Sequence, residues 1–105
     1  MNHYTNKKGY NGIRATPDWV FEASQPPAPA SHPFGAYFTT LPPGTKNLAI
    51  RLRIPRMKTD YVFSFADVND LTPLEGDRGE FIFYSPVDYV LKQDRQVYHG
   101  KRADA

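Results

Sequence analysis

The chain lacks cysteine altogether, and it lacks any long apolar run. Without cysteine there is no disulfide framework and no thiolate chemistry, which fits a reducing cytosol and does not exclude export. No apolar segment approaches the ~18 residues that a membrane-spanning helix needs. No basic segment followed by an apolar one opens the chain, as a secretory signal would. We therefore expect a single domain over residues 1–105, without membrane contact or thiol chemistry.

A strong charge of one sign is also missing. The 13 lysines and arginines outnumber the 11 aspartates and glutamates, which gives a formal net charge of +2. This balance permits an anionic partner and does not require nucleic acid. What the chain has in abundance is aromatic residues, with 7 Phe, 7 Tyr and 1 Trp. So many aromatic side chains indicate a β-rich fold with an aromatic-lined cleft, although they are also good core residues.

Alternation of apolar and polar residues predicts several short strands. We expect them at residues 2–5, around Trp19 and Phe21, and at 34–41, 48–54, 60–66, 80–84 and 96–98. Thr5 or Asn6 can cap a short helix that ends before Pro17. A turn or short helix is expected at 86–91, and frayed residues at 101–105. The pattern predicts an α+β fold with mainly antiparallel strands and one or two short helices, and it leaves the strand order open.

Proline is concentrated in the segment 24–33. Four of these residues are proline, which excludes a helix or a central strand and favours an extended surface loop. We expect residues 25–33 to lie over one side of the binding cleft and to be among the more mobile parts of the fold.

The expected strand at 48–54 has an apolar and a basic face. Its apolar face consists of Leu48, Ile50, Leu52 and Ile54. Arg51 and Arg53 lie on the other face, and the cations Arg56 and Lys58 follow the strand. Such a basic face is either solvated or docks an acidic protein or nucleic acid. Few aromatics lie between these charges, which argues against a platform for single-stranded nucleic acid.

The most apolar stretch is Gly79–Tyr84, and a carboxylate stands at its start. Phe81 and Phe83 alternate with Ile82 and Tyr84, as in a strand covered on both faces. Burying Glu80 would be costly unless chemistry there requires it. Two interpretations stay open: a carboxylate within a site, or one in water at the mouth of the strand.

Three segments together resemble the ADP-ribosyltransferases of the His-Tyr-Glu class, to which diphtheria toxin and the poly(ADP-ribose) polymerases belong. The first is His3-Tyr4-Thr5, similar to the His-Gly-Ser/Thr motif. The second is Phe34-Gly35-Ala36-Tyr37-Phe38, and the third is Glu80-Phe81-Ile82-Phe83-Tyr84 with Val87 to Leu91 after it. With Gly9 to Ile13, the chain looks most like the compact bacterial toxins named for a His-Tyr-Asp signature. The resemblance covers residues 3 to about 91 and implies a small fold of two sheets around an NAD cleft.

The resemblance also implies roles for individual residues. Glu80 would hold the ribose 2′-hydroxyl and stabilise the positive charge that develops when the nicotinamide–ribose bond breaks. Tyr37 would stack on the nicotinamide. His3 would donate a hydrogen bond from its ring N–H to the other ribose, and the backbone of Tyr4 would meet the carboxamide. The remaining residues expected at the NAD site are Thr5, Arg14, Phe34, Gly35 and Phe38, with Arg14 near the pyrophosphate or simply solvated. No metal is implied.

The sequence departs from the family pattern at three places. Tyr4 stands where glycine is usual, so its side chain must turn away from the nicotinamide. Residues 45–48 stand where the polymerases have a second stacking tyrosine. The His-Tyr-Asp signature calls for an aspartate as third residue, for which Asp60 and Asp88 are the alternatives to Glu80.

The implied activity is transfer of ADP-ribose from NAD⁺ to a protein in a recipient cell. The domain would be the C-terminal toxin domain of a larger protein that is secreted or delivered as an effector. A cognate immunity protein, acidic enough to suit the basic face, would protect the producing cell. Alternatives are an NAD⁺ glycohydrolase on the same fold, modification of nucleic acid, which the scarcity of aromatics among the basic residues disfavours, and a non-enzymatic binding module.

Overall fold

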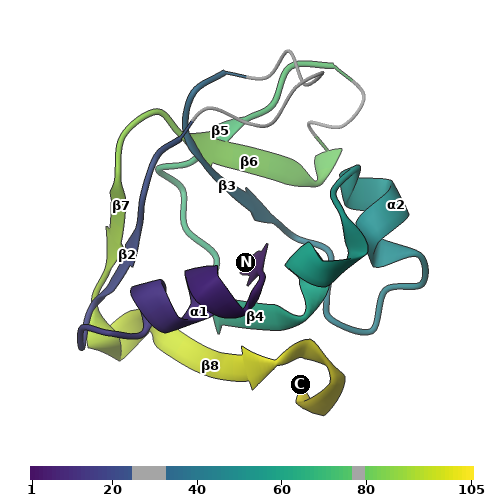
Figure 1. Ribbon diagram of the computed structural model, residues 1–105. Coiled ribbons are helices and arrows are strands. Elements are labelled where there is room, and N and C mark those ends of the chain that lie inside the picture. Colours follow the sequence, from purple (N-terminus) through teal and green to yellow (C-terminus); the bar gives the residue numbers. More distant parts are fainter. Residues whose placement is uncertain (25–32, 77–79) are drawn as a thin grey trace.

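Six antiparallel strands form one sheet through the protein, and two further strands pair beside it (Figure 1). The computed structural model describes residues 1–24, 33–76 and 80–105. In chain order the elements, with η for a 3-10 helix, are β1 (Asn2–Thr5), α1 (Lys7–Ile13), β2 (Trp19–Phe21), β3 (Ala36–Thr39), α2 (Leu48–Leu52), η1 (Arg56–Thr59), β4 (Tyr61–Phe65), β5 (Thr72–Pro73), β6 (Ile82–Ser85), β7 (Tyr89–Leu91), η3 (Gln93–Arg95), β8 (Gln96–Lys101) and η4 (Arg102–Asp104). The predicted α+β class with antiparallel sheets and short helices is confirmed.

The large sheet has the order β5-β6-β3-β1-β4-β8 and is nearly divided between β1 and β3. Along one edge, β1 pairs with β4 over its whole length, from Asn2 to Thr5. Along the other edge, only Asn2 pairs with a residue of β3, which is Thr39. The two strands therefore diverge after Asn2. Their facing edges must satisfy polar backbone groups by means other than sheet pairing.

Apolar side chains pack on both faces of this sheet. On one face, α1 and the β2–β7 pair cover a cluster that includes Phe21, Phe38 and Phe63. On the other face, α2 covers a cluster that includes Tyr4 and Val62, with Tyr37 packed against it. Successive residues of a strand point to opposite faces, so Phe38 and Tyr37 belong to different clusters. Both layers are visible around the sheet in Figure 1.

The predicted strand at 48–54 is wrong, because Leu48–Leu52 form the helix α2. Leu48 and Leu52 are buried one helical turn apart, whereas Ile50 between them is 75% exposed. Asn47 and Arg53 flank the helix with left-handed backbone, each at φ 56°. Two leucines four residues apart satisfy both a period of two and a period of 3.6. The alternation therefore did not distinguish a strand from one turn of helix.

Two smaller predictions near the C-terminus are also wrong. Residues Tyr89–Leu91 form the strand β7, where only a turn or short helix was expected, because they pair with β2 and bury Tyr89 and Leu91. Residues 101–105 are not frayed. Arg102 anchors them, since its Nε donates to the Thr59 carbonyl at 2.8 Å and its Nη1 donates to the Pro43 carbonyl at 3.1 Å.

The remaining predicted elements are found close to their expected positions. Asn6, one of the two expected caps, caps α1 through its Oδ1, which accepts from the Gly9 N–H at 2.9 Å. The proline-rich loop at 25–32 lies outside the described residues. Within the described ranges, no helix is long and apolar enough to cross a membrane.

Candidate functional site

His3 and Tyr37 meet where β1 and β3 diverge. The Nδ1 atom of His3 lies 2.7 Å from the backbone carbonyl oxygen of Tyr37. A carbonyl oxygen can only accept a hydrogen bond, so Nδ1 carries the proton and Nε2 is the acceptor of the neutral ring. This bond connects two residues that are 34 positions apart. It joins the first and second motifs across the split, beyond the last strand pairing at Asn2.

Aromatic neighbours keep the His3 ring neutral. Its centroid lies 4.9 Å from that of Phe21 and 5.5 Å from that of Phe38. Burial lowers the pKa of His3 below 6.5, and the hydrogen bond to the Tyr37 carbonyl raises it by less. The uncharged ring therefore predominates at neutral pH. A ribose hydroxyl at this ring would donate to Nε2, because the only ring N–H is already used.

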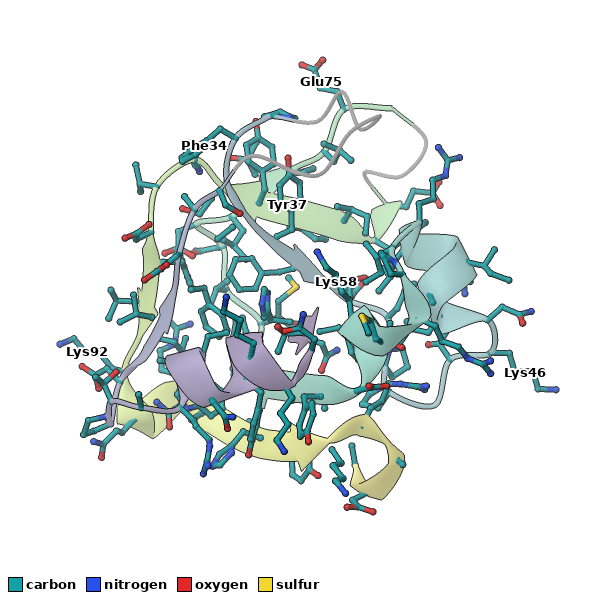
Figure 2. The ribbon with its side chains drawn as sticks, viewed as in Figure 1. Phe34, Tyr37, Lys46, Lys58, Glu75 and Lys92 are labelled. Carbon is teal, nitrogen blue, oxygen red and sulfur yellow. The ribbon has the colours of Figure 1, made fainter. Side chains whose placement is uncertain are left out.

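Tyr37 lies half-buried where β3 and β6 run side by side (Figure 2). Its ring stacks on Tyr84, the residue opposite it on β6, with centroids 5.6 Å apart and planes 23° apart. Its hydroxyl donates to the Pro33 carbonyl. Burial raises the pKa of Tyr37, and the adjacent Tyr84 raises it further. A nicotinamide that stacks on Tyr37 would have to use the face turned away from Tyr84.

Tyr4 and Thr5 complete the first motif. The Tyr4 side chain is buried on the face opposite the Phe38 cluster, and its hydroxyl donates to the Leu41 carbonyl at 2.7 Å. Burial raises the pKa of Tyr4 far above the physiological range. Thr5 ends β1 and lies directly over α1, since a Cβ at Gly9 would come within 2.0 Å of its hydroxyl oxygen. An alanine at position 9 would therefore force the Thr5 hydroxyl to rotate away.

The other residues of the second motif occupy three different environments. Phe34 is 52% exposed. Gly35 is buried and exchanges two backbone hydrogen bonds of 3.0 Å with Ser24. Phe38 is 2% exposed and packs in the core against Phe21 and His3. Phe38 thus supports the His3 ring, and of these three only Phe34 projects far into solvent.

Glu80 is exposed and precedes β6, in a turn of 3-10 geometry. The strand was expected to include Glu80. In the structure its carboxylate instead lies in water at the mouth of the strand, which is the second of the two interpretations given above. The Thr40 N–H donates to the carbonyl of Phe81 at 3.2 Å, which places Glu80 beyond the end of β3. Tyr37 lies three residues earlier, about 10 Å along a strand. Glu80 is therefore near the end of the split where β1 and β3 are still paired.

Asp60 and Asp88, the alternatives for the third residue, have separate positions. The Asp88 carboxylate accepts a hydrogen bond from the Ala23 N–H at 2.8 Å, which ties the turn after β6 to the end of β2. Asp60 is exposed after η1, and its backbone carbonyl accepts from the Arg102 N–H at 2.8 Å. Neither of these carboxylates, nor that of Glu80, is hydrogen-bonded to His3.

Arg14 lies on the surface at the end of α1. Its guanidinium carbon is 5.3 Å from the centroid of the Tyr10 ring, and its Nε donates to the Asn11 side chain at 3.3 Å. These contacts hold the guanidinium against its own helix. Arg14 belongs to the face of the sheet that α1 covers, which is the face of the His3 ring and is opposite to the side chain of Tyr37.

A groove of about 490 Å³ lies away from these residues, between Trp19 and β8. Its lining includes Gln96 and His99 and none of the residues of the three motifs. No carboxylate or cationic side chain of Lys or Arg lines it. We place the candidate site at the split, where the His3 ring meets the backbone of Tyr37 and the Tyr37–Tyr84 pair lies on the other face of the sheet.

Sequence analysis missed Tyr84 as a partner of Tyr37. Antiparallel pairing of the second and third motifs in register would have placed the two tyrosines opposite each other.

Across residues 1–24, 33–76 and 80–105, no three His, Cys, Asp or Glu side chains are grouped so that they could hold a metal ion.

Comparisons with protein-family models, with curated proteins and with solved structures found no match to this chain.

Proposed function

We propose that this domain is a mono-ADP-ribosyltransferase that binds NAD⁺ at the split between β1 and β3. The hydrogen bond from His3 Nδ1 to the Tyr37 carbonyl is the observation on which the proposal chiefly depends. It joins the His3 ring to the backbone of Tyr37, while the side chains of the two residues lie on opposite faces of the sheet. Pairing of β3 with β6 sets the third motif beside the second. The resemblance in sequence supplies the reaction, since no other comparison bears on it.

The reaction breaks one bond and forms one. The bond between the ribose C1′ and the nicotinamide nitrogen breaks, and its electron pair leaves with neutral nicotinamide. The acceptor atom of the target protein then bonds to C1′ and loses its proton. In this scheme Tyr37 orients the nicotinamide by stacking, and the neutral His3 accepts a hydrogen bond from a ribose hydroxyl at Nε2. Both roles position the substrate before bond breaking.

A carboxylate is still needed to stabilise the oxocarbenium-like ribose. We assign this role to Glu80, because it directly precedes the strand that pairs with β3. The Asp88 carboxylate already accepts from the Ala23 N–H, and Asp60 follows η1 on the other side of β1. Since Glu80 is exposed, its carboxylate has freedom to turn toward a bound ribose.

The biological setting belongs to the same proposal. The domain would act as a toxin or effector inside a recipient cell, delivered as part of a larger protein. A cognate immunity protein would bind over the split and block NAD⁺ entry. The exposed cations Arg51, Arg53 and Arg56 favour an acidic surface on that partner, because opposite charge speeds association.

The experiment is incubation of the protein with NAD⁺ tagged on its adenine side, in a cell lysate. We expect protease-sensitive label on a macromolecule, with release of nicotinamide. Tyr37→Ala should abolish labelling, whereas Tyr37→Phe should retain it because stacking requires the ring alone. Label that nucleases remove would indicate a nucleic-acid target, and free ADP-ribose without label would indicate a glycohydrolase. Unchanged NAD⁺ would contradict the proposal and favour a non-enzymatic binding module.

A further inference from the structure

Lys58 differs from the other lysines of this chain in its burial. Lys7, Lys8, Lys46, Lys92 and Lys101 are all exposed, and Lys58 alone is half-buried. In Figure 2 Lys46 and Lys92 extend outward, whereas Lys58 points from η1 toward the middle of the molecule, below Tyr37 in that view. A cation that withdraws from water needs an anionic or polar partner.

No such partner for Lys58 is found among the described residues. Arg102, which contacts Thr59 next to Lys58, is also half-buried. The Arg102 guanidinium donates to two backbone carbonyls, those of Thr59 and Pro43. The Lys58 ammonium forms no hydrogen bond or ion pair with any residue that the structure describes. The single ion pair within the described ranges joins the terminal amine of Met1 to Asp67.

The backbone around Lys58 is firmly held. Its N–H donates to the Pro55 carbonyl at 3.0 Å. The next residue, Thr59, is 1% exposed, and its hydroxyl donates to the Arg56 carbonyl at 2.7 Å. The Thr59 carbonyl accepts in turn from Arg102 Nε at 2.8 Å. The direction in which Lys58 leaves η1 is therefore determined by buried contacts on both sides of it.

This element lies on the same side of the sheet as Tyr37. The helix α2 and Ile54 pack in the cluster that includes Tyr4 and borders Tyr37. The segment η1 follows at once and packs against both α2 and β1, the strand of His3. Arg14, by contrast, belongs to the opposite face and is engaged with Tyr10 and Asn11.

The surrounding sequence favours an anion at this place. Between Glu22 and Asp60 the chain has no acidic residue, and it has five cations: Lys46, Arg51, Arg53, Arg56 and Lys58. Four of these are exposed and water compensates their charge. The fifth, Lys58, is the one that faces inward. A lysine ammonium is a common ligand of phosphate groups.

We infer that Lys58 binds the diphosphate group of the dinucleotide at the split. This inference depends on the proposed function, since it names the residue that holds the charged middle of NAD⁺. The diphosphate supplies a counter-charge that none of residues 1–24, 33–76 and 80–105 supplies, and the two nucleoside parts then extend to either side of η1. Lys58 is thus a binding residue and takes the role expected of Arg14, whose guanidinium is held by Tyr10 and Asn11.

The test is calorimetric titration of the whole domain with ADP-ribose and with nicotinamide, which has no phosphate. Lys58→Gln should weaken ADP-ribose binding about tenfold or more, the scale of one charge-assisted contact, and leave nicotinamide binding unchanged. Lys58→Arg should restore most of the affinity. Lys46→Gln, an exposed lysine of the same basic segment, is the matched control and should bind as the parent does.

The possible results separate this inference from the proposed function. If the parent protein binds neither ADP-ribose nor NAD⁺, the proposed function fails, and the inference fails with it. If the parent binds and Lys58→Gln binds equally well, the inference alone is overturned. An equal loss in Lys46→Gln would show that overall charge is responsible and would also overturn it. Equal melting temperatures of the variants would exclude unfolding as the cause.

Discussion

A single hydrogen bond determines which tautomer of its neutral ring His3 presents. Because the Tyr37 carbonyl can only accept, the His3 proton is on Nδ1 and the lone pair is on Nε2. The residue that was expected to donate from its ring to a ribose is thereby an acceptor. The same bond couples the position of the ring to the backbone of Tyr37, so the two motifs cannot move independently.

The low pKa of His3 makes the stability of the domain depend on pH. Burial lowers this pKa below 6.5, so the unfolded chain binds the proton more readily than the folded protein. Stability should therefore fall as the pH drops below about 6.5, by at most ~1.4 kcal/mol per pH unit for one proton. Denaturant unfolding between about pH 7.5 and 5.5, above the range where most carboxylates titrate, would measure it. The variant His3→Gln should lose this slope, and an unchanged slope would contradict the assignment.

The third catalytic position is tested by neutral substitutions of three carboxylates. Glu80→Gln should reduce ADP-ribose transfer on the order of 10²-fold, the effect of losing one electrostatic stabiliser. Its stability should change little, because Glu80 is exposed. Asp60→Asn should retain transfer. Asp88→Asn should lower the melting temperature by weakening the bond to the Ala23 N–H, and its transfer rate should be compared below that temperature. Full activity in Glu80→Gln together with inactivity in Asp60→Asn or Asp88→Asn would show that the third motif was misassigned.

At the scale of elements, Gly35 allows the start of β3 to approach the end of β6 closely, because it has no side chain. A Cβ at this position would lie 2.6 Å from the Ser85 carbonyl oxygen. Gly35→Ala should therefore destabilise the fold by ~1–3 kcal/mol, the usual cost of overpacking. Gly12→Ala in α1 is the control, since nothing lies within 4 Å of its added methyl group. It should stabilise by ~0.5–1 kcal/mol through higher helix propensity, and chemical denaturation of both would reveal the difference in sign.

How much the sequence predicts depends on the length of each element and on its partners. The strands Asn2–Thr5 and Tyr61–Phe65 and the cap Asn6 follow from local pattern and turn chemistry. The five-residue helix α2 does not, because a buried Leu48 and Leu52 suit either period. The strand β7 does not either, because its three residues gain their structure from pairing with β2.

The candidate site shows the same division between local and distant determinants. His3 and Tyr37 were singled out by motif, and the structure brings the His3 ring into contact with the backbone of Tyr37. Tyr84 was missed because its role arises from cross-strand register. Glu80 was expected inside the strand, but β6 begins only at Ile82. Where a strand begins depends on its pairing with β3, which the sequence of β6 alone does not contain.

At the scale of the whole molecule, the C-terminal segment holds the centre of the chain in place. Arg102 reaches from η4 to the carbonyls of Thr59 and Pro43, and its own N–H donates to Asp60. One residue thus joins the end of β8 to the loop before α2 and to η1. Removal of the last four residues would break hydrogen bonds to two other parts of the fold, the loop before α2 and the end of η1.

The substitution Arg102→Met tests this role. It keeps most of the aliphatic stem and removes both side-chain hydrogen bonds, so we expect a loss of ~1–3 kcal/mol in the free energy of unfolding. Lys101→Met, at the exposed preceding residue, should have little effect. Hydrogen exchange would locate the change: the amides of Lys58 and Asp60, which donate to the Pro55 and Met57 carbonyls, should exchange faster in Arg102→Met. Because η1 positions Lys58, ADP-ribose binding should weaken in the same variant. Unchanged exchange in η1 would mean that Arg102 only covers the surface and that η1 is held by α2 and β1 alone.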